Sequence, residues 1–356
     1  MPQLFQISAE WTEQQWFNTG GTRAKKYLLS PGGKFFYFKR SQFKLATQTK
    51  PGKDFRYEFW NEIIAYEIGT LLGFKMLRYD IAIDGEIMGC ISESMISSDN
   101  QELIEGVKYL QAYSPEYDPG KKEHRTWYTF NLIEGSLDAA NIGNYINDIL
   151  ELIVFDALIG NGDRHQENWA IITRQRLITD LASQEIIRNP TKKPNKMSLW
   201  LLNFLKSMEI KQRKLNPTLP GLYYKPETSF APIYDSGSSL GRELLEDTVE
   251  LFLTSDKELE KYISKGTSEI HWENKKVSHF ELIRNLLGSS YKEAITNIIN
   301  RVINGYDSSK IETILEEVDQ KTPESHYQYR IPASRKRLIL KIITLRFEML
   351  RATLNG

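Results

Sequence analysis

Short apolar runs separated by turn signals dominate the first part of the chain. Tyr27-Leu28-Leu29 and Phe35-Phe36-Tyr37-Phe38 are branched or aromatic, and Ser30-Pro31-Gly32-Gly33 lies between them. Aromatic and branched residues favour strands, whereas a Pro-Gly-Gly segment favours a reversal of the chain direction. The pattern therefore predicts a β-hairpin.

A helix and a second hairpin are predicted next. Over residues 58–72 the apolar side chains recur at three-to-four spacing, and Gly73 supplies a stop signal, which is typical of an amphipathic helix. Short strands are predicted at residues 79–83 and 87–92, because Asp84-Gly85 between them favours a two-residue hairpin turn. This part of the chain is therefore expected to be rich in strands.

The periodicity then becomes helical. Apolar residues recur at helical spacing over 142–158, a pattern that ends at Gly160-Asn161-Gly162, and helical spacing dominates again after Glu243. Strands first and helices later predict an α+β fold with two lobes. We expect a strand-rich lobe over residues 1–98 and a helical lobe over residues 99–356.

Composition and charge narrow the class of protein. The 356 residues are 40% hydrophobic, which is enough for a large core, and 46 Lys and Arg balance 46 Asp and Glu. This balance gives no reason to expect a nucleic acid or an anionic membrane as an obligatory partner. Cys90 is the only cysteine, which excludes an intramolecular disulfide. With no apolar run of about 18 residues, we expect a cytoplasmic protein.

The polar segment at residues 160–168 carries most of the candidate chemistry. It follows the long apolar pattern, precedes a short predicted strand at 169–172, and contains Asp163 and Asn168. Transfer of a γ-phosphoryl group needs a carboxylate that orients the accepting hydroxyl, and oxygen ligands that hold Mg²⁺ on the phosphates. Asp163 suits the first role and Asn168 the second. The alternative is an ordinary capped turn, where Asn, Gly and Asp are common for backbone reasons.

A second metal ligand is expected further along the chain. Residues 230–234, with the sequence Phe-Ala-Pro-Ile-Tyr, are predicted to form a short buried strand, and Asp235-Ser236-Gly237 follows directly. A carboxylate at the end of a strand, next to a glycine turn, would project from the edge of a sheet. Asp235 is therefore the candidate partner of Asn168 in holding the metal.

The segment Asp163-Arg164-His165-Gln166-Glu167-Asn168, followed by Asp235, resembles the bacterial HipA-like Ser/Thr kinases and is also similar to phosphoinositide 3/4-kinases. The resemblance implies a two-lobed protein-kinase-like fold and transfer of phosphate from Mg-ATP to a protein hydroxyl. It places Asp163, Asn168 and Asp235 in the catalytic set, with Asn168 and Asp235 on the metal. His165 belongs to the same candidate set, although a histidine here is more typical of a hydrogen bond that holds neighbouring loops. Arg164 receives no role.

The same resemblance suggests nucleotide contacts in the first lobe. Lys39 is the candidate lysine for the α- and β-phosphates, and Glu62 in the predicted helix is its expected partner. The alternatives are an exposed lysine at a strand end and a glutamate on a solvated helix face. Further contacts are expected from a glycine-bearing loop and from the hinge, at Gly20, Gly21, Thr22, Glu93 and Met95. The hydroxyls of Thr19 and Thr22 are candidate self-phosphorylation sites.

A long basic segment separates the two candidate loops. Asp163 and Asp235 are 72 positions apart, whereas the families that the motif resembles keep these loops much closer. Residues 174–225 hold eleven Lys or Arg against three acidic residues, and we interpret them as an insertion. A solvated face is the plain interpretation of this segment, and docking of an acidic protein or of RNA is the alternative.

The resemblance also implies partners, and it leaves other functions open. Translation components such as aminoacyl-tRNA synthetases are the implied substrates of a toxin-like kinase, with a small DNA-binding antitoxin as a partner. The second hypothesis is a lipid or small-molecule kinase, similar to phosphoinositide kinases or aminoglycoside phosphotransferases. The third is an inactive nucleotide-binding module that acts through the basic segment.

Overall fold

The computed structural model describes most of the chain and divides it into two units. The described residues are 1–14, 25–41, 43–44, 53–97, 100–177 and 224–355. The first unit contains Met1–Ser94, Glu105–Ala170 and Pro232–Gly356, and the second contains Met95–Ile104 and Ile171–Ala231. Thr19, Gly20, Gly21 and Thr22 lie outside the described residues, as does most of the basic segment, residues 178–223.

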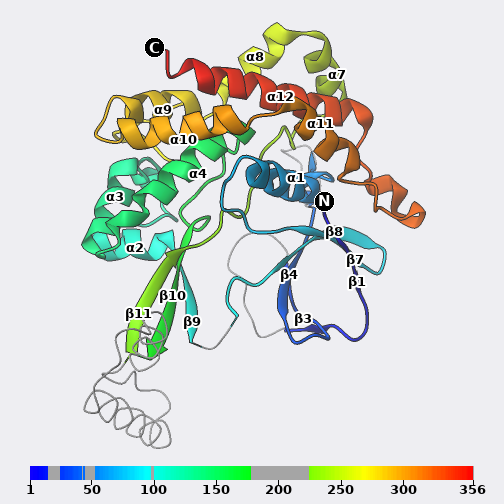
Figure 1. The fold of residues 1–356 in the computed structure, drawn as a ribbon, viewed down its shortest axis with the longest axis horizontal. Helices are drawn as coiled ribbons and strands as arrows, with labels where there is room; N and C mark the ends of the chain where they lie inside the picture. Colours follow the sequence, from blue (N-terminus) through cyan, green and yellow to red (C-terminus); the bar gives the residue numbers. More distant parts are fainter. Residues whose placement is uncertain (15–24, 42, 45–52, 98–99, 178–223, 356) are drawn as a thin grey trace, which may run out of the picture. The chain divides into compact units, whose positions relative to one another are not determined.

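A six-stranded sheet forms the amino-terminal part of the first unit, in the order β1-β7-β8-β4-β3-β2 (Figure 1). β1 runs parallel to β7, and the other neighbours are antiparallel. The two expected hairpins are present as β3–β4 and β7–β8. The strands are β1 (Leu4–Ile7), β2 (Thr12–Glu13), β3 (Lys25–Leu29), β4 (Phe35–Arg40), β7 (Asp80–Asp84) and β8 (Ile87–Glu93), with a separate ribbon of β5 (Phe43–Lys44) and β6 (Lys53–Asp54).

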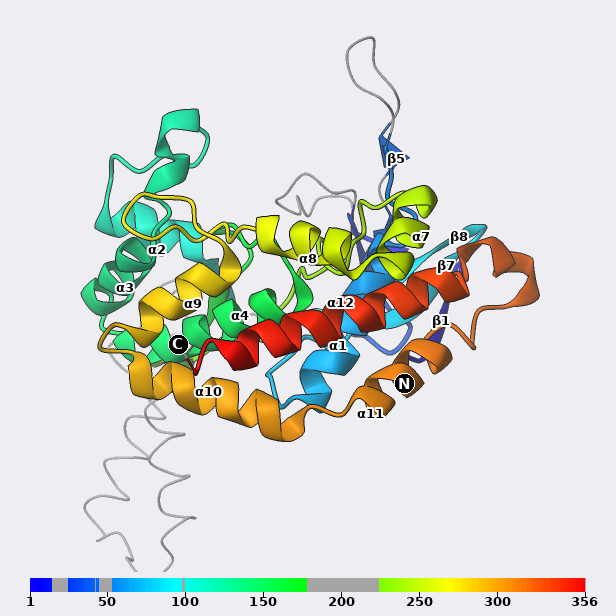
Figure 2. The same ribbon diagram turned by 90° about the horizontal axis from the view of Figure 1, so that it is seen from above.

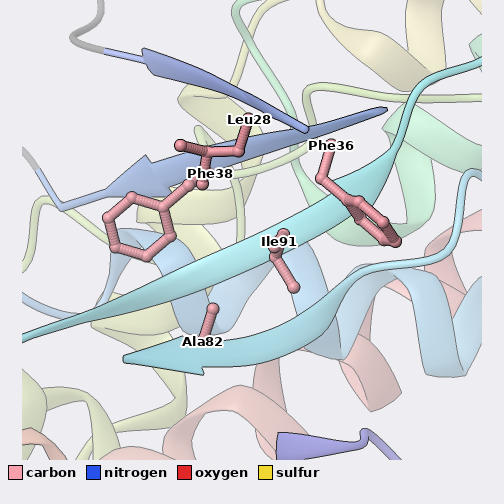
Figure 3. Close-up of a cluster of buried hydrophobic side chains, with 5 residues drawn as sticks. All are labelled: Leu28, Phe36, Phe38, Ala82 and Ile91. Carbon is pink, nitrogen blue, oxygen red and sulfur yellow. The ribbon is translucent and has the colours of Figure 1, made fainter. Parts of the chain in front are cut away.

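Alternation along these strands separates the two faces of the sheet. One face buries a cluster of Leu28, Phe36, Phe38, Ala82 and Ile91 (Figure 3), against which Phe5, Ile7, Trp11 and Ile87 pack. Successive side chains of a strand point to opposite faces, so Lys39 points away from the cluster that holds Phe38. Helix α1 (Glu58–Leu71) contacts β4 and β8.

Helix α1 carries both apolar and polar buried residues. Its apolar residues pack at helical spacing, and Gly73, with a φ of 78°, follows it as expected from the sequence. Charged side chains are seldom buried without a partner. Glu58 pairs with Arg242, and the Asn61 amide nitrogen donates to the Ser239 carbonyl oxygen at 2.6 Å. The polar residues of α1 therefore bind the segment that follows Asp235.

The rest of the first unit is mainly helical. Helix α12 runs between α7 and α8 on one side and α10 and α11 on the other (Figure 2), and it contacts all four as well as α4. Within the described ranges, none of the helices has the length and apolar character needed to cross a membrane. The helices are α2 (Gly106–Tyr113), α3 (Phe130–Ala139), α4 (Ile146–Ile159), α7 (Glu246–Thr254), α8 (Asp256–Lys265), α9 (His279–Leu287), α10 (Lys292–Gly305), α11 (Ser308–Glu317) and α12 (Ala333–Ala352), with 3-10 turns at Lys122–Trp127, Gly143–Tyr145 and Glu324–Tyr329.

Helix α4 leads into the polar segment that carries the candidate catalytic residues. It begins at Ile146 rather than at residue 142, because Gly143–Tyr145 form a 3-10 turn that precedes it. It ends at Ile159, and the next residue, Gly160, has a φ of 71° and donates its backbone N–H to the Asp156 carbonyl oxygen at 2.8 Å. A glycine adopts this left-handed conformation without the strain that a side chain would add.

A three-stranded sheet belongs mainly to the second unit, in the order β11-β10-β9, and β10 and β11 are antiparallel. Its strands are β9 (Gln101–Glu105), β10 (Ala170–Leu177) and β11 (Tyr224–Phe230). The prediction of a strand at residues 230–234 is wrong, because β11 ends at Phe230. Pro232 lacks the N–H that a continuous ladder requires, and Ile233 forms only an isolated bridge with Met76. Asp235 therefore follows an irregular segment and not a strand.

Candidate active site

Lys39 is buried on the face of the sheet that lies toward α1. It lies inside β4, which continues to Arg40, and not at an exposed strand end, the alternative that the sequence left open. The lysine is 8% exposed and Glu62 is 2% exposed, which excludes a surface role for either. The Lys39 Nζ atom donates to Glu62 Oε1 at 3.0 Å and to Asp235 Oδ1 at 3.1 Å.

These two carboxylates keep the lysine charged. Burial by itself would lower the pKa of Lys39, but the charges of Asp235 and Glu62 outweigh it, and the pKa lies well above its ordinary value. A buried charge is tolerated only with good pairing and further hydrogen bonds. The site therefore contains a fixed cation, which is what the phosphates of a nucleotide require.

Tyr79 adds a further contact to this ion cluster. Its hydroxyl oxygen accepts from Lys39 Nζ and from the Asp235 backbone N–H, both at 3.3 Å. Burial raises the pKa of the Tyr79 phenol, so the residue is neutral. It therefore positions the lysine and the aspartate without adding charge.

The segment around Asp235 is held in an unusual conformation. Asp235 has a φ of 56°, a left-handed value that costs a residue with a side chain about 1–2 kcal/mol. The Ser236 backbone N–H donates to Glu62 Oε2 at 2.8 Å, so that Glu62 binds Lys39 with one oxygen and this loop with the other. The hydrogen bonds to Glu62 and Tyr79 offset the strain and fix the direction of the Asp235 carboxylate.

The loop after α4 positions Asp163 and Asn168 with hydrogen bonds of its own. The Asp163 backbone N–H donates to Asn161 Oδ1 at 3.2 Å, and Asn168 Nδ2 donates to the Asp163 carbonyl oxygen at 2.7 Å. Asn168 is buried, whereas Asp163 is partly exposed. A partly exposed carboxylate is suited to meet an incoming group.

Arg164 ties this loop to the segment around Asp235. It is 1% exposed, and its guanidinium donates to both carboxylate oxygens of Asp156 at 2.9 Å. It also donates to the carbonyl oxygens of Asn168 and Tyr234 and to Ser236 Oγ. Burial opposes the charge, but the Asp156 carboxylate raises the pKa of Arg164, so the ion pair persists. One arginine thus sets the spacing between the two loops.

A direct hydrogen bond also joins the two loops. Ser238 Oγ donates to Asp163 Oδ2 at 2.9 Å, although the two residues are 75 positions apart. The segments at 161–168 and 235–239 are therefore neighbours in the first unit, linked by Arg164 and by Ser238.

His165 pairs with Glu167 and not with Asp163. The His165 Nδ1 atom lies 2.7 Å from Glu167 Oε2, and both side chains are 37% exposed. Burial lowers the pKa of His165, but Glu167 outweighs it, and the net shift is upward. The Tyr234 hydroxyl donates to the Glu167 carbonyl oxygen at 2.7 Å. These bonds fit a residue that orders the loop.

Asn168 and Asp235 offer oxygen ligands that suit Mg²⁺. The Asn168 amide nitrogen is bound to a carbonyl, which leaves the amide oxygen as its metal-binding atom, and Asp235 supplies a carboxylate. Mg²⁺ is commonly held by one or two protein oxygens together with substrate phosphates and water. In the described part of the chain no three His, Cys, Asp or Glu side chains cluster as a metal site. The residues fit a metal that arrives with a nucleotide.

The two expected hinge residues belong to different units. Glu93 ends β8, and its exposed carboxylate pairs with Lys34 Nζ at 2.9 Å. Met95 belongs to the second unit. Their contacts to adenine stay predictions.

Sequence patterns missed three of the residues that organise this site. Arg164, Tyr79 and Ser238 act through partners that are distant along the chain, such as Ser236, which is 72 positions from Arg164. The one available signal was the position of Arg164 inside the Asp-Arg-His segment.

The fold defines the class of protein to which the chain is similar. A strand-rich amino-terminal part, a helical carboxyl-terminal part and a lysine–glutamate pair between β4 and α1 together form a protein-kinase-like fold. The structure of the Helicobacter pylori proinflammatory kinase CtkA superposes with a TM-score of 0.62 at 15% identity, over 97% of this chain and 96% of that one.

A second solved structure is more distant. HipA from Shewanella oneidensis, solved with HipB and operator DNA, superposes with a TM-score of 0.42 at 12% identity, over 98% of this chain and 67% of that one. No protein-family model matches the sequence, and a search of the curated proteins gives no match.

Proposed function

We propose that the chain is an ATP-dependent Ser/Thr protein kinase. The observation that carries the proposal is the buried Lys39 ammonium, held at 3.0 Å from Glu62 and 3.1 Å from Asp235. Protein kinases use such a lysine–glutamate pair with a metal-binding aspartate to hold ATP. The kinase-like fold supports the same conclusion.

Each residue of the candidate site then has one role. Lys39 binds the α- and β-phosphates, with Glu62 holding it in place. Asn168 and Asp235 hold Mg²⁺, which neutralises negative charge on the phosphates when it is bound. Asp163 accepts the hydrogen bond of the incoming hydroxyl and takes its proton, while the His165–Glu167 pair keeps the loop ordered.

A hydroxyl acceptor is supported by the surroundings of Asp163. This carboxylate accepts a hydrogen bond from a serine hydroxyl, Ser238 Oγ, at 2.9 Å. That geometry is the one that a seryl or threonyl acceptor needs. A translation component as the natural acceptor, and an antitoxin as a partner, follow from the family resemblance alone.

The direct test is transfer of label from [γ-³²P]ATP with Mg²⁺ to a protein lysate, a lipid panel and an aminoglycoside panel. We expect labelled proteins with wild type and at least about a hundredfold less label with Asp163→Ala or Asp235→Ala, the scale of losing a general base. Asp247→Ala, an exposed carboxylate of α7, is the matched control and should label like wild type. Label found only in lipid or aminoglycoside would mean that this class, and not protein, is the acceptor. Equal labelling by wild type and the alanine variants would refute the assignment of the site.

A further inference from the structure

Ser238 has the geometry of a phosphoryl acceptor within its own chain. A general base must lie about 2.6–3.2 Å from the oxygen whose proton it takes. Ser238 Oγ lies 2.9 Å from Asp163 Oδ2, and its proton points to that carboxylate because a carboxylate can only accept. The hydroxyl comes from the loop that also carries Asp235, three residues earlier.

The neighbouring serines do not share this geometry. Ser236 Oγ accepts from the Arg164 guanidinium at 3.2 Å, and Ser239 Oγ donates to the Ser236 carbonyl oxygen at 2.6 Å. Both are buried, whereas Ser238 is partly exposed. Ser238 is therefore the serine of this loop whose hydroxyl is both accessible and directed at the candidate base.

We propose that Ser238 is a self-phosphorylation site, modified within the same molecule by transfer from Mg-ATP. This inference rests on the proposed kinase function. Ser238 Oγ forms a bond to the γ-phosphorus of ATP while the bond from that phosphorus to the β,γ-bridging oxygen breaks. ADP leaves with the electron pair, and the serine proton passes to Asp163. Thr19 and Thr22 were the hydroxyls suggested by the sequence, and Ser238 is a different site.

The product would limit the activity of the enzyme. A phosphoserine carries a charge of about −1.5 to −2 near neutral pH, and here it would stand beside the Asp163 carboxylate. Like charges at hydrogen-bond distance repel each other, and the phosphate would fill the place of the next hydroxyl. Self-modification at Ser238 therefore lowers transfer to other acceptors.

The test is incubation of the full chain with Mg-[γ-³²P]ATP, followed by digestion and identification of the modified residue by mass spectrometry. We expect phosphate on Ser238, added at a rate per molecule that does not change when the protein is diluted. When wild type is mixed with the Asp163→Asn variant, Ser238 of the variant should stay unmodified, because the reaction occurs within one molecule. Pre-incubation with Mg-ATP should lower later transfer to lysate proteins at least about tenfold.

Two variants separate this inference from the general function. Ser238→Ala should lose that phosphopeptide, and pre-incubation with Mg-ATP should no longer lower its rate of transfer to lysate proteins relative to the same variant without pre-incubation. Ser239→Ala, the matched serine, should behave like wild type. Labelled lysate proteins together with an unmodified Ser238 would overturn the inference and leave the kinase function standing. A wild-type chain that transfers phosphate to no acceptor and hydrolyses no ATP would overturn both.

Discussion

Two buried cations organise the candidate site at the scale of single residues. Lys39 is paired with Glu62 and Asp235, and Arg164 is paired with Asp156. Burying such groups is costly, so the pairs add little net stability, but removing one partner leaves an uncompensated charge. These pairs fix the positions of the lysine, the candidate metal ligands and the candidate base.

The Lys39–Glu62 pair gives the first prediction. Glu62→Gln removes one of the two carboxylate charges that pair with Lys39, and hydrogen bonds to charged groups contribute about 1.5–3 kcal/mol. We expect kcat/KM for ATP to fall roughly ten- to a hundredfold in steady-state kinetics. Glu67→Gln, on the same helix but paired with the Met1 amino group, serves as the control. An unchanged kcat/KM in the Glu62 variant would contradict the role of the pair.

Variants of the Arg164–Asp156 pair are expected to change stability and activity independently. Arg164→Met leaves Asp156 buried without its cation and should lower the free energy of unfolding by about 3–5 kcal/mol, measured by denaturant titration. Adding Asp156→Leu removes the orphaned charge and should recover most of that loss. The double variant should still transfer phosphate poorly, because the hydrogen bonds from Arg164 to the carbonyl oxygens of Asn168 and Tyr234 are then lost. Recovery of activity along with stability would show that Arg164 only stabilises the fold.

The His165–Glu167 pair predicts a pH dependence of stability. Because the pKa of His165 is raised above 6.5 in the folded chain, its contribution is complete below pH 6.5 and is lost as the pH rises through the raised value. Burial raises the pKa of Glu167 but His165 outweighs it and lowers the pKa, so its contribution is complete above pH 4.5 and is lost as the pH falls through the lowered value.

The stabilising effect should therefore be largest between about pH 4.5 and 6.5. Both side chains are more than one third exposed, so solvent screening limits the pair to at most about 1 kcal/mol. Thermal denaturation of wild type and His165→Gln across pH 4–9 measures the difference. The deficit of the variant should shrink as the pH rises above 6.5 and through the raised pKa of His165. A deficit that grows with pH would mean that the pair is not ionic.

At the scale of elements, the end of α4 positions the polar loop. Gly160 has a left-handed φ of 71°, and a Cβ atom placed there would lie 2.8 Å from Arg346 Nε of α12. Arg346 donates to the Ala157 carbonyl oxygen at 2.7 Å, and burial lowers the pKa of its guanidinium to about 10. The absence of a side chain at Gly160 is what lets α12 bind the last turn of α4.

Replacement of this glycine should be unusually destabilising. Gly160→Ala combines the left-handed cost of about 1–2 kcal/mol with displacement of Arg346. Gly33→Ala is the matched control, because Gly33 has a φ of 76° and nothing within 4 Å of an added Cβ. Denaturant titration should therefore show a larger loss for Gly160→Ala. Equal losses would mean that the contact with Arg346 contributes nothing.

The elements that the sequence predicted well are those set by local pattern. Both hairpins and helices α1 and α4 follow from apolar spacing and from turn residues within a few positions. The strand expected at residues 230–234 failed because an apolar run does not distinguish a strand from an irregular buried segment, and Pro232 interrupts the ladder there.

Sequence patterns could not predict the side-chain contacts between segments that are distant along the chain. Asp163, Asn168, Lys39, Glu62 and Asp235 could be proposed because they belong to a motif or to its expected order. The roles of Arg164 and Tyr79 depend on which loop packs beside them, and single-sequence periodicity contains no such contact information. The burial of Lys39 and Glu62 likewise follows from packing that periodicity does not specify.

At the scale of the first unit, α1 joins the sheet to the carboxyl-terminal half of the chain. The Trp60 indole N–H donates to the Tyr329 carbonyl oxygen at 2.6 Å, and Asn61 and Glu58 bind the segment after Asp235. The sheet and α1, within residues 1–94, thus share one compact unit with residues 105–170 and 232–356. Lys39 from the sheet can therefore meet Asp235 at a fixed distance.

The most direct test of that convergence is calorimetric titration of ATP into wild type and Asp235→Asn, with and without Mg²⁺. Because Asp235 is the carboxylate ligand of the metal in this account, Mg²⁺ should raise the ATP affinity of wild type about tenfold or more, or about 1.4 kcal/mol. It should raise that of Asp235→Asn less than about twofold, while Asp247→Asn follows wild type. An equal gain in affinity with Asp235→Asn would contradict the assignment of the metal to this site.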